Sequence, residues 1–240
     1  MPKFTEIPER DRIIVALDCD KQEALRLADL LAGHATWMKV GMTLYYQEGP
    51  SIVQELKDRG FKVFLDLKFH DIPHQVRGAA KAAVKTGADM LTMHSIGTIE
   101  MMRAGQEGVM EAAAEMGTDP AATLGVTVLT SMGQGELDEI GVARYIEQQV
   151  LIMAAHVKVS GLSGVVASPQ EASELRKVLG PDAYIVTPGV RPATADVGDQ
   201  KRVATPKAAF EAGASHLVIG RPITQAADPV AAFEDIVASL

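Results

Sequence analysis

The stretch FKVFLDLKFHD at residues 61–71 decides the fold. Its first seven residues, 61–67, form a mostly apolar run with the length and composition of a buried strand. Charged side chains concentrate at the end of this run and directly after it, at Asp66, Lys68 and Asp71. A buried strand that ends in reactive side chains is typical of the parallel sheets of α/β proteins, in which ligands bind beyond the carboxyl ends of the strands.

Seven further strand-sized runs occur, at residues 12–17, 37–40, 90–94, 124–129, 164–167, 184–187 and 216–219. Stretches with a helical spacing of apolar residues follow them, at 21–32, 51–59, 75–86, 98–116, 145–159, 170–179, 206–212 and 229–238. Eight strands that alternate with helices in 240 residues predict an α/β fold, a (β/α)8 TIM barrel that forms a single domain over residues 1–240. The polar stretch RPATADVGDQKR at 191–202 is predicted to be a mobile loop.

Composition argues against several classes of protein. The net charge is -8 and only 5% of residues are aromatic, whereas nucleic-acid-binding surfaces are basic and stack bases on aromatic rings. The polar N-terminal stretch is unlike a secretory signal, and the apolar runs are too short to cross a bilayer. We therefore expect a cytoplasmic protein without nucleic-acid or membrane partners. The single cysteine, Cys19, excludes an intrachain disulfide and a cysteine-rich metal site.

The active site of a TIM barrel lies at the C-terminal ends of its strands, so reactive residues at those ends are candidates. Alternation along a strand places Asp66 and Lys68 on one face, about 6.6 Å apart along it, and Lys39 lies near the end of the preceding run. Because a buried charge requires a partner, we expect an array of carboxylates and ammonium groups that includes Asp18 and Asp71. An ordinary cluster of ion pairs at the rim of the sheet is the alternative interpretation.

Two segments after the seventh and eighth runs combine glycine with arginine, TPGVR at 187–191 and GRPI at 220–223. The corresponding loops often bind phosphate in TIM barrels. Gly220 lets a phosphate approach backbone N–H groups, and Arg221 adds a charge-assisted hydrogen bond. The segments therefore predict a phosphate site, the alternative being glycines that only turn the chain and solvated arginines.

Six motifs, in this order along almost the whole chain, resemble the bacterial orotidine 5′-phosphate decarboxylase family. They are IVALD at 14–18, MKVG at 38–41, DLKFHDIP at 66–73, LTS at 129–131, TPGVRP at 187–192 and GRPI at 220–223. The D-x-K-x-x-D-I-P pattern is specific, whereas G-R-P-I also occurs in related barrels. The resemblance implies decarboxylation of orotidine 5′-monophosphate (OMP) to uridine 5′-monophosphate (UMP) in de novo pyrimidine biosynthesis, by a Lys/Asp charge network without cofactor or metal.

The resemblance also implies a role for each matching residue. Lys68 donates a proton to carbon 6 of the pyrimidine, and Asp66 lies against the substrate carboxylate. Lys39 and Asp18 hold the ribose hydroxyls and the charge array, while Thr130 contacts the pyrimidine. The phosphate is held by Arg191, Gln200, Gly220 and Arg221.

A homodimer with shared active sites is implied as well, because the family residue that matches Asp71 reaches into the site of the partner subunit. The chain departs from the family at His74 and Gln75, where the pair Asn-Thr is common. Gln75 therefore takes the position that contacts the ribose or the dimer interface.

Three other functions fit parts of the pattern. A Mg²⁺-dependent enzyme of the same superfamily, acting on keto-sugar phosphates, would carry a glutamate in place of Lys39, whose ammonium group repels a metal. A Schiff-base aldolase that uses Lys68 would need a neutral amine, which flanking carboxylates disfavour. A non-catalytic nucleotide-binding barrel would have no need of the complete charge array.

Overall fold

A closed barrel of parallel strands lies at the centre of the computed structural model, which describes residues 4–191 and 204–240. Each strand pairs with the next, and the last pairs with the first to close the barrel. The strands are β1 Ile13–Leu17, β2 Trp37–Gly41, β3 Lys62–Phe69, β4 Met90–His94, β5 Ala122–Val126, β6 Gly164–Val166, β7 Tyr184–Thr187 and β8 His216–Ile219. This topology confirms the predicted (β/α)8 barrel.

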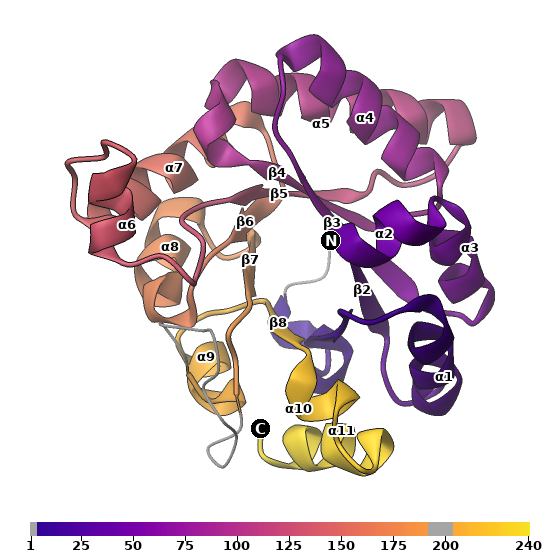
Figure 1. Cartoon of the computed structure of the whole chain (residues 1–240). Coiled ribbons are helices and arrows are strands. Elements are labelled where there is room, and N and C mark those ends of the chain that lie inside the picture. The colour runs from indigo at the N-terminus through magenta and orange to yellow at the C-terminus, as the bar shows by residue number, and fades with distance from the viewer. Residues whose placement is uncertain (1–3, 192–203) are drawn as a thin grey trace.

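Helices surround the barrel as an outer ring (Figure 1). They are α1 Lys21–Leu31, α2 Met42–Glu48, α3 Ser51–Asp58, α4 Pro73–Lys85, α5 Thr98–Met116, α6 Gln134–Glu139, α7 Ile146–Ser160, α8 Ala172–Leu179, α9 Pro206–Glu211, α10 Arg221–Thr224 and α11 Pro229–Ala238. Short 3₁₀ helices are η1 Phe4–Glu6, η2 Glu9–Arg12, η3 Ser95–Gly97 and η4 Pro169–Glu171. No helix within residues 4–191 and 204–240 has the length and apolar character needed to span a membrane.

The alternation of side chains along β1 divides the core into two layers. Ile14 and Ala16 belong to the cluster inside the barrel, together with Phe64. Val15 and Leu17 belong to the larger cluster between the strands and the helices. All five residues of β1 are buried, as expected for a parallel strand covered on both faces. The barrel interior is thus a packed core, which leaves room for a ligand only at an end of the barrel.

Aromatic side chains close the end of the barrel where the strands begin. Phe4 packs edge-on against Tyr184 with ring centroids 4.7 Å apart, and Tyr184 stacks on His216 at 5.3 Å. Trp37 also contacts His216, at 5.8 Å. Burial, together with the charges of two nearby cations, lowers the pKa of His216 to about 3, so the ring is neutral at this seal. The opposite end, where the strands finish, is therefore the open one.

The fifth strand departs most from the sequence-based prediction. We expect it at 124–129, whereas β5 spans Ala122–Val126. The Met132 N–H donates to the Leu129 carbonyl at 2.9 Å, so the chain turns here. Val128 and Leu129 line the open end of the barrel. The predicted strand starts two residues too late and ends three residues too late, because the apolar side chains of Val128 and Leu129 line the cavity after the strand has ended.

The spacing of apolar residues does not predict three short helices, α2, α6 and α10. They contain seven, six and four residues, too few to show the repeated i, i+3, i+4 spacing of apolar side chains. The omission of α10 matters for function, because this helix begins at Arg221, two residues after the end of β8.

Thr98, the first residue of α5, has φ 79° and ψ 163°, a backbone conformation that is nearly restricted to glycine. Such a conformation costs a β-branched residue about 1–3 kcal/mol. Thr98→Gly should therefore increase the free energy of unfolding by about 1 kcal/mol and raise Tm by about 2–4 °C, as measured by calorimetry. Thr86→Gly is the matched control and should lower Tm, because Thr86 has an ordinary φ of -76°. A lower Tm for Thr98→Gly would show that the backbone conformation of Thr98 does not destabilise the protein.

Candidate active site

A cavity of 510 Å³ opens at the C-terminal ends of the strands. The charged residues that line it are Asp18, Lys39, Asp66, Lys68, Arg191 and Arg221. Four of these side chains are cationic and two are carboxylates, although the whole chain has a net charge of -8. A concave site with this excess of positive charge attracts anionic ligands.

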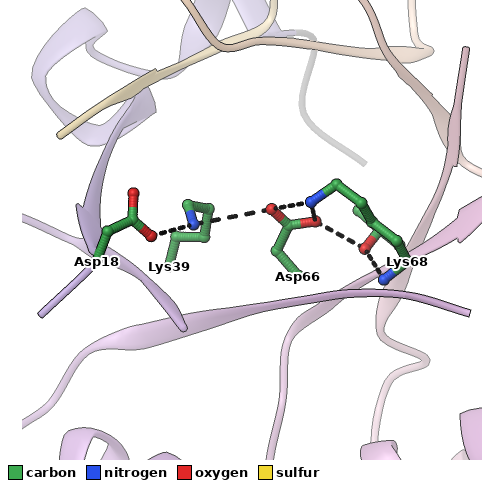
Figure 2. A network of polar contacts seen from close by, with 5 residues as sticks. Asp18, Lys39, Asp66 and Lys68 are labelled. Carbon is green, nitrogen blue, oxygen red and sulfur yellow. Dashed lines mark hydrogen bonds and ion pairs between the residues drawn. The ribbon is translucent and has the colours of Figure 1, made fainter. Parts of the chain in front are cut away.

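Four of the charged side chains form a row of alternating sign across the ends of β1, β2 and β3 (Figure 2). Lys39 Nζ lies 3.0 Å from Asp18 Oδ1 and 3.8 Å from Asp66 Oδ2. Lys68 Nζ donates to both carboxylate oxygens of Asp66 at 2.9 Å. The two inner side chains, those of Lys39 and Asp66, are only 10% and 14% exposed. Each lies between two opposite charges, which offsets the cost of removing it from water.

The backbone of β3 is irregular where the row ends. The pairing of β3 with β4 shifts between Leu65 and Phe69, where three residues of β3 lie opposite a single residue of β4. Within this bulge Lys68 has φ 53°, in the left-handed region, which costs a non-glycine residue on the order of 1–2 kcal/mol. The bulge interrupts the regular alternation of side chains between the two faces of β3, which is expected to place Asp66 and Lys68 on one face. The irregular backbone at Lys68 nevertheless lets its ammonium group contact the Asp66 carboxylate.

Asp66 is ionised although it is buried. Burial alone would raise the pKa of this carboxyl, but the charges of Lys39 and Lys68, with hydrogen bonds from Lys68 and Thr92, hold the pKa below its ordinary value. The carboxylate therefore carries its charge at neutral pH. Because its pKa is depressed in the folded state, it adds stability that is present above about pH 4 and is lost as the pH falls through the folded pKa.

Glycines leave room for the charged row. A Cβ atom at Gly41 would lie 3.2 Å from Lys39 Nζ and 3.3 Å from Asp18 Oδ1, closer than ordinary packing allows. A Cβ atom at Gly220 would lie 3.4 Å from Ala16 Cβ and 3.9 Å from Asp18 Oδ2. Asp18 is thus approached from β2 on one side and from the end of β8 on the other.

The loops after β7 and β8 form another part of the lining. Gly189, Arg191, Gly220 and Arg221 all line the cavity. Gly189 has φ 76°, which glycine adopts without strain. The Arg191 N–H donates to the Ala204 carbonyl at 3.0 Å, and α10 begins at Arg221 with Gly220 as its N-cap. Glycine backbone, two guanidinium groups and the start of a helix are a combination suited to binding phosphate.

The remaining predicted residues lie in different places. Thr130 is buried and lines the cavity after β5. Asp71 and Gln75 are exposed, and neither belongs to the cavity lining within the part of the chain that the structure describes. The Asp71 carboxylate accepts a hydrogen bond from the next backbone N–H at 2.6 Å. Gln200 lies outside the described residues, as does the predicted loop 191–202 apart from its first residue.

Thr92, Thr224 and Gln225 are not among the site residues predicted from the sequence. Thr92 of β4 is fully buried and hydrogen-bonds to the bulge, a feature with no signal in the sequence. Thr224 and Gln225 line the cavity and follow Arg221 by three and four residues. Recognition of a helix start at Arg221 would have placed them on the same face, because residues at this spacing are neighbours on a helix.

Lys68→Met should raise the pKa of Asp66, because it removes one ammonium group and the hydrogen bonds that it donates to the carboxylate. A carbon-13 NMR titration of the Asp66 carboxyl measures this shift. Lys62→Met is the matched control, at the opposite end of the same strand, and should leave the titration unchanged. An Asp66 titration that Lys68→Met does not move would show that the pair with Lys68 does not keep the carboxylate ionised.

The chain is similar in sequence and structure to known proteins that share one name. The orotidine 5′-phosphate decarboxylase of Moorella thermoacetica is 48% identical over 233 residues, which cover 96% of this chain and 92% of that protein. The enzyme of the same name from Vibrio atlanticus is 49% identical over 226 residues, 94% of this chain and 96% of that protein. A crystal structure of orotidine 5′-phosphate decarboxylase from Lactobacillus acidophilus matches with a TM-score of 0.84 at 38% identity, covering 94% of this chain and 97% of that one.

The family model gives the same assignment over nearly the whole barrel. It matches residues 11–236, from the start of β1 to the last helix, and therefore includes every member of the charged row and both glycine–arginine segments. The chain therefore belongs to the orotidine 5′-phosphate decarboxylase / HUMPS family.

Proposed function

We propose that this protein decarboxylates OMP to UMP in the pyrimidine biosynthesis of the cytoplasm, by means of the charged row and without a cofactor. The row of Asp18, Lys39, Asp66 and Lys68 carries the proposal, because it places ammonium groups and carboxylates side by side in the cavity. The names of the relatives at 48% and 49% identity support the same reaction. The excess of cationic side chains in the lining suits a substrate with both a phosphate and a carboxylate.

The chemistry explains why a lysine is needed. Loss of carbon dioxide breaks the bond between carbon 6 and the carboxylate and leaves the electron pair on carbon 6, in the plane of the ring. There the pair lies outside the π system, so an electron sink of the pyridoxal phosphate type gives little help. A fixed ammonium group beside carbon 6 stabilises the developing negative charge instead. Transfer of a proton from that group to carbon 6 then completes UMP.

Lys68 supplies both the charge and the proton in this proposal. Its Nζ is oriented by hydrogen bonds to both oxygens of Asp66, so little reorganisation is needed during the reaction. Asp66 lies against the substrate carboxylate and disfavours the ground state relative to the neutral carbon dioxide that leaves. The Lys68 side chain is 25% exposed, which lets solvent return the proton after each turnover.

Lys39 separates this proposal from the Mg²⁺-dependent chemistry of the same superfamily. Its ammonium group lies between two carboxylates, at 3.0 Å from Asp18 and 3.8 Å from Asp66, where it would repel a divalent cation. The same position lets Lys39 and Asp18 hold the ribose hydroxyls of the substrate. We therefore expect the activity to survive treatment with EDTA.

The phosphate is held away from the charged row, whereas the base lies beside it. The residues proposed to bind the phosphate are Arg191, Gln200, Gly220 and Arg221. Because the phosphate takes no part in bond breaking, its binding energy is available to position the pyrimidine ring over Lys68. Thr130, which is buried in the lining after β5, contacts the pyrimidine in this arrangement.

A second copy of the chain completes the site in this proposal. Large apolar side chains are exposed after β2, β3 and β4, namely Met42 (46%), Tyr46 (75%), Ile72 (64%) and Ile96 (51%). Exposed apolar side chains that cluster on one face are typical of an interface between proteins. A homodimer that covers them would bring Asp71 toward the partner's Lys68. Gln75, in the first turn of α4, would then contact the ribose or the interface.

Purified protein treated with EDTA should convert OMP to UMP, which the ultraviolet absorbance of the pyrimidine reports. Lys68→Ala should lower kcat by at least about 10²–10³-fold, because it removes the fixed charge at carbon 6. Lys62→Ala is the matched control and should retain full activity, since Lys62 lies at the closed end of the barrel beside Trp37.

Each alternative function has its own outcome in this assay. Nucleotide binding without turnover would contradict the proposal and favour a binding protein. Turnover of a keto-sugar phosphate only with added Mg²⁺ would favour the metal-dependent branch. Covalent trapping of a carbonyl substrate on Lys68 by borohydride would favour a Schiff-base aldolase.

The shared site can be tested by mixing two inactive variants, Lys68→Ala and Asp71→Ala. If Asp71 acts on the partner's Lys68, subunit exchange creates heterodimers with one intact site, and about one quarter of the wild-type activity should return. If Asp71 acts within its own chain, every site in the mixture lacks one of the two residues and no activity returns. Size-exclusion chromatography with light scattering establishes that the two variants exchange subunits.

A further inference from the structure

Thr92 lies at the centre of the β3 bulge, on the neighbouring strand. It is the single β4 residue opposite residues 66–68, and its side chain is fully buried. Its Oγ1 accepts a hydrogen bond from the Lys68 backbone N–H at 2.9 Å. The same hydroxyl donates to Asp66 Oδ1, also at 2.9 Å. The hydroxyl thus donates one hydrogen bond to Asp66 and accepts one from Lys68, the two residues that β3 contributes to the charged row.

These contacts close a ring of hydrogen bonds. The ring runs from the Lys68 N–H to the Thr92 hydroxyl, on to the Asp66 carboxylate, and back to Lys68 through its Nζ. The bulge displaces the Lys68 N–H from the regular pairing with β4, and a buried N–H without a partner costs free energy. The hydroxyl supplies that partner, and it does so where the backbone is strained, with φ 53° at Lys68.

We propose that Thr92 is a positioning residue that holds the Lys68 backbone in its left-handed conformation and fixes the orientation of the Asp66 carboxylate, so that the Lys68 ammonium group meets carbon 6 of the substrate. This inference rests on the proposed function for its kinetic consequence. It concerns a residue that acts through Lys68 and Asp66, since Thr92 is not part of the cavity lining within the described residues.

The role belongs to the hydroxyl and not to the volume of the side chain. Valine has nearly the shape of threonine but neither donates nor accepts, so Thr92→Val leaves the Lys68 N–H and Asp66 Oδ1 without this partner. Serine keeps the hydroxyl and loses only a methyl group. The bulge in Thr92→Val would lose the contact that offsets its strain, and Lys68 would shift relative to the substrate.

Steady-state kinetics of Thr92→Val and Thr92→Ser with OMP test the inference. Thr92→Val should lower kcat by about 10–100-fold with little change in KM, because misplacement of a reacting group on the order of 1 Å costs rate rather than affinity. Thr92→Ser should retain most of the wild-type kcat. The matched control is Thr123→Val on β5, a fully buried strand threonine whose hydroxyl donates to Gln106, and it should leave kcat unchanged.

Hydrogen exchange of the Lys68 backbone amide, followed by NMR, provides a readout that needs no substrate. The amide should exchange faster in Thr92→Val than in the wild type, and at nearly the wild-type rate in Thr92→Ser. Thermal unfolding of all variants separates this local change from a loss of folding.

The outcomes separate the inference from the proposed function. A Thr92→Val protein with the wild-type kcat and the wild-type exchange rate of the Lys68 amide would overturn the inference. An equal loss of kcat in Thr92→Val and Thr123→Val would also overturn it, because Thr92 would then act only through packing. If the wild-type protein does not turn over OMP, the proposed function is wrong, and the amide exchange still decides whether the Thr92 hydroxyl holds the bulge.

Discussion

The burial of an ionised Asp66 between two ammonium groups is the interaction on which the rest of the site depends. A carboxylate that is 14% exposed would be protonated or expelled without Lys39 and Lys68, and each of these lysines would be costly to bury without Asp66. The three side chains therefore fix one another, and Asp18 extends the alternation to the rim. Their order across β1, β2 and β3 follows from the parallel pairing of these strands, which brings consecutive strand ends together.

The charged row and the glycine–arginine segments lie at the ends of different strands of the barrel. Strands β1 to β3 carry the charged row, whereas the loops after β7 and β8 carry glycines and arginines suited to a phosphate. The two parts meet where β8 pairs with β1, since the position of a Cβ at Gly220 lies within 3.9 Å of Asp18. A ligand with a charged group at each end can thus span the cavity, while the rings of Phe4, Trp37, Tyr184 and His216 pack against one another at the other end of the barrel.

The sequence predicts the barrel because eight buried strands alternate with helices, and this repetition survives errors such as the displaced β5. It also predicts which residues stand near strand ends, because charged residues such as Asp18 and Lys68 directly follow apolar runs. The bulge in β3 could not be predicted, since Lys68 is not a residue type that marks a left-handed conformation. Thr92 could not be predicted either. A threonine inside an apolar strand is interpreted as a core residue as long as the bulge in the neighbouring strand is unknown. Asp71 is exposed and lies outside the cavity lining of the described residues, so its role in a shared site stays a prediction.

The closure of the barrel has a consequence for how the molecule is made. The pairing of Ile13 with Leu217 joins segments that are far apart along the chain, and contacts of such long separation carry a large entropic cost and form slowly. During synthesis the charged row emerges early, while Gly220 and Arg221 emerge only after most of the chain has left the ribosome. Until β8 is in place, β1 presents an unpaired edge to other chains. Closure of the barrel therefore completes the cavity and protects the nascent sheet from aggregation in a single event.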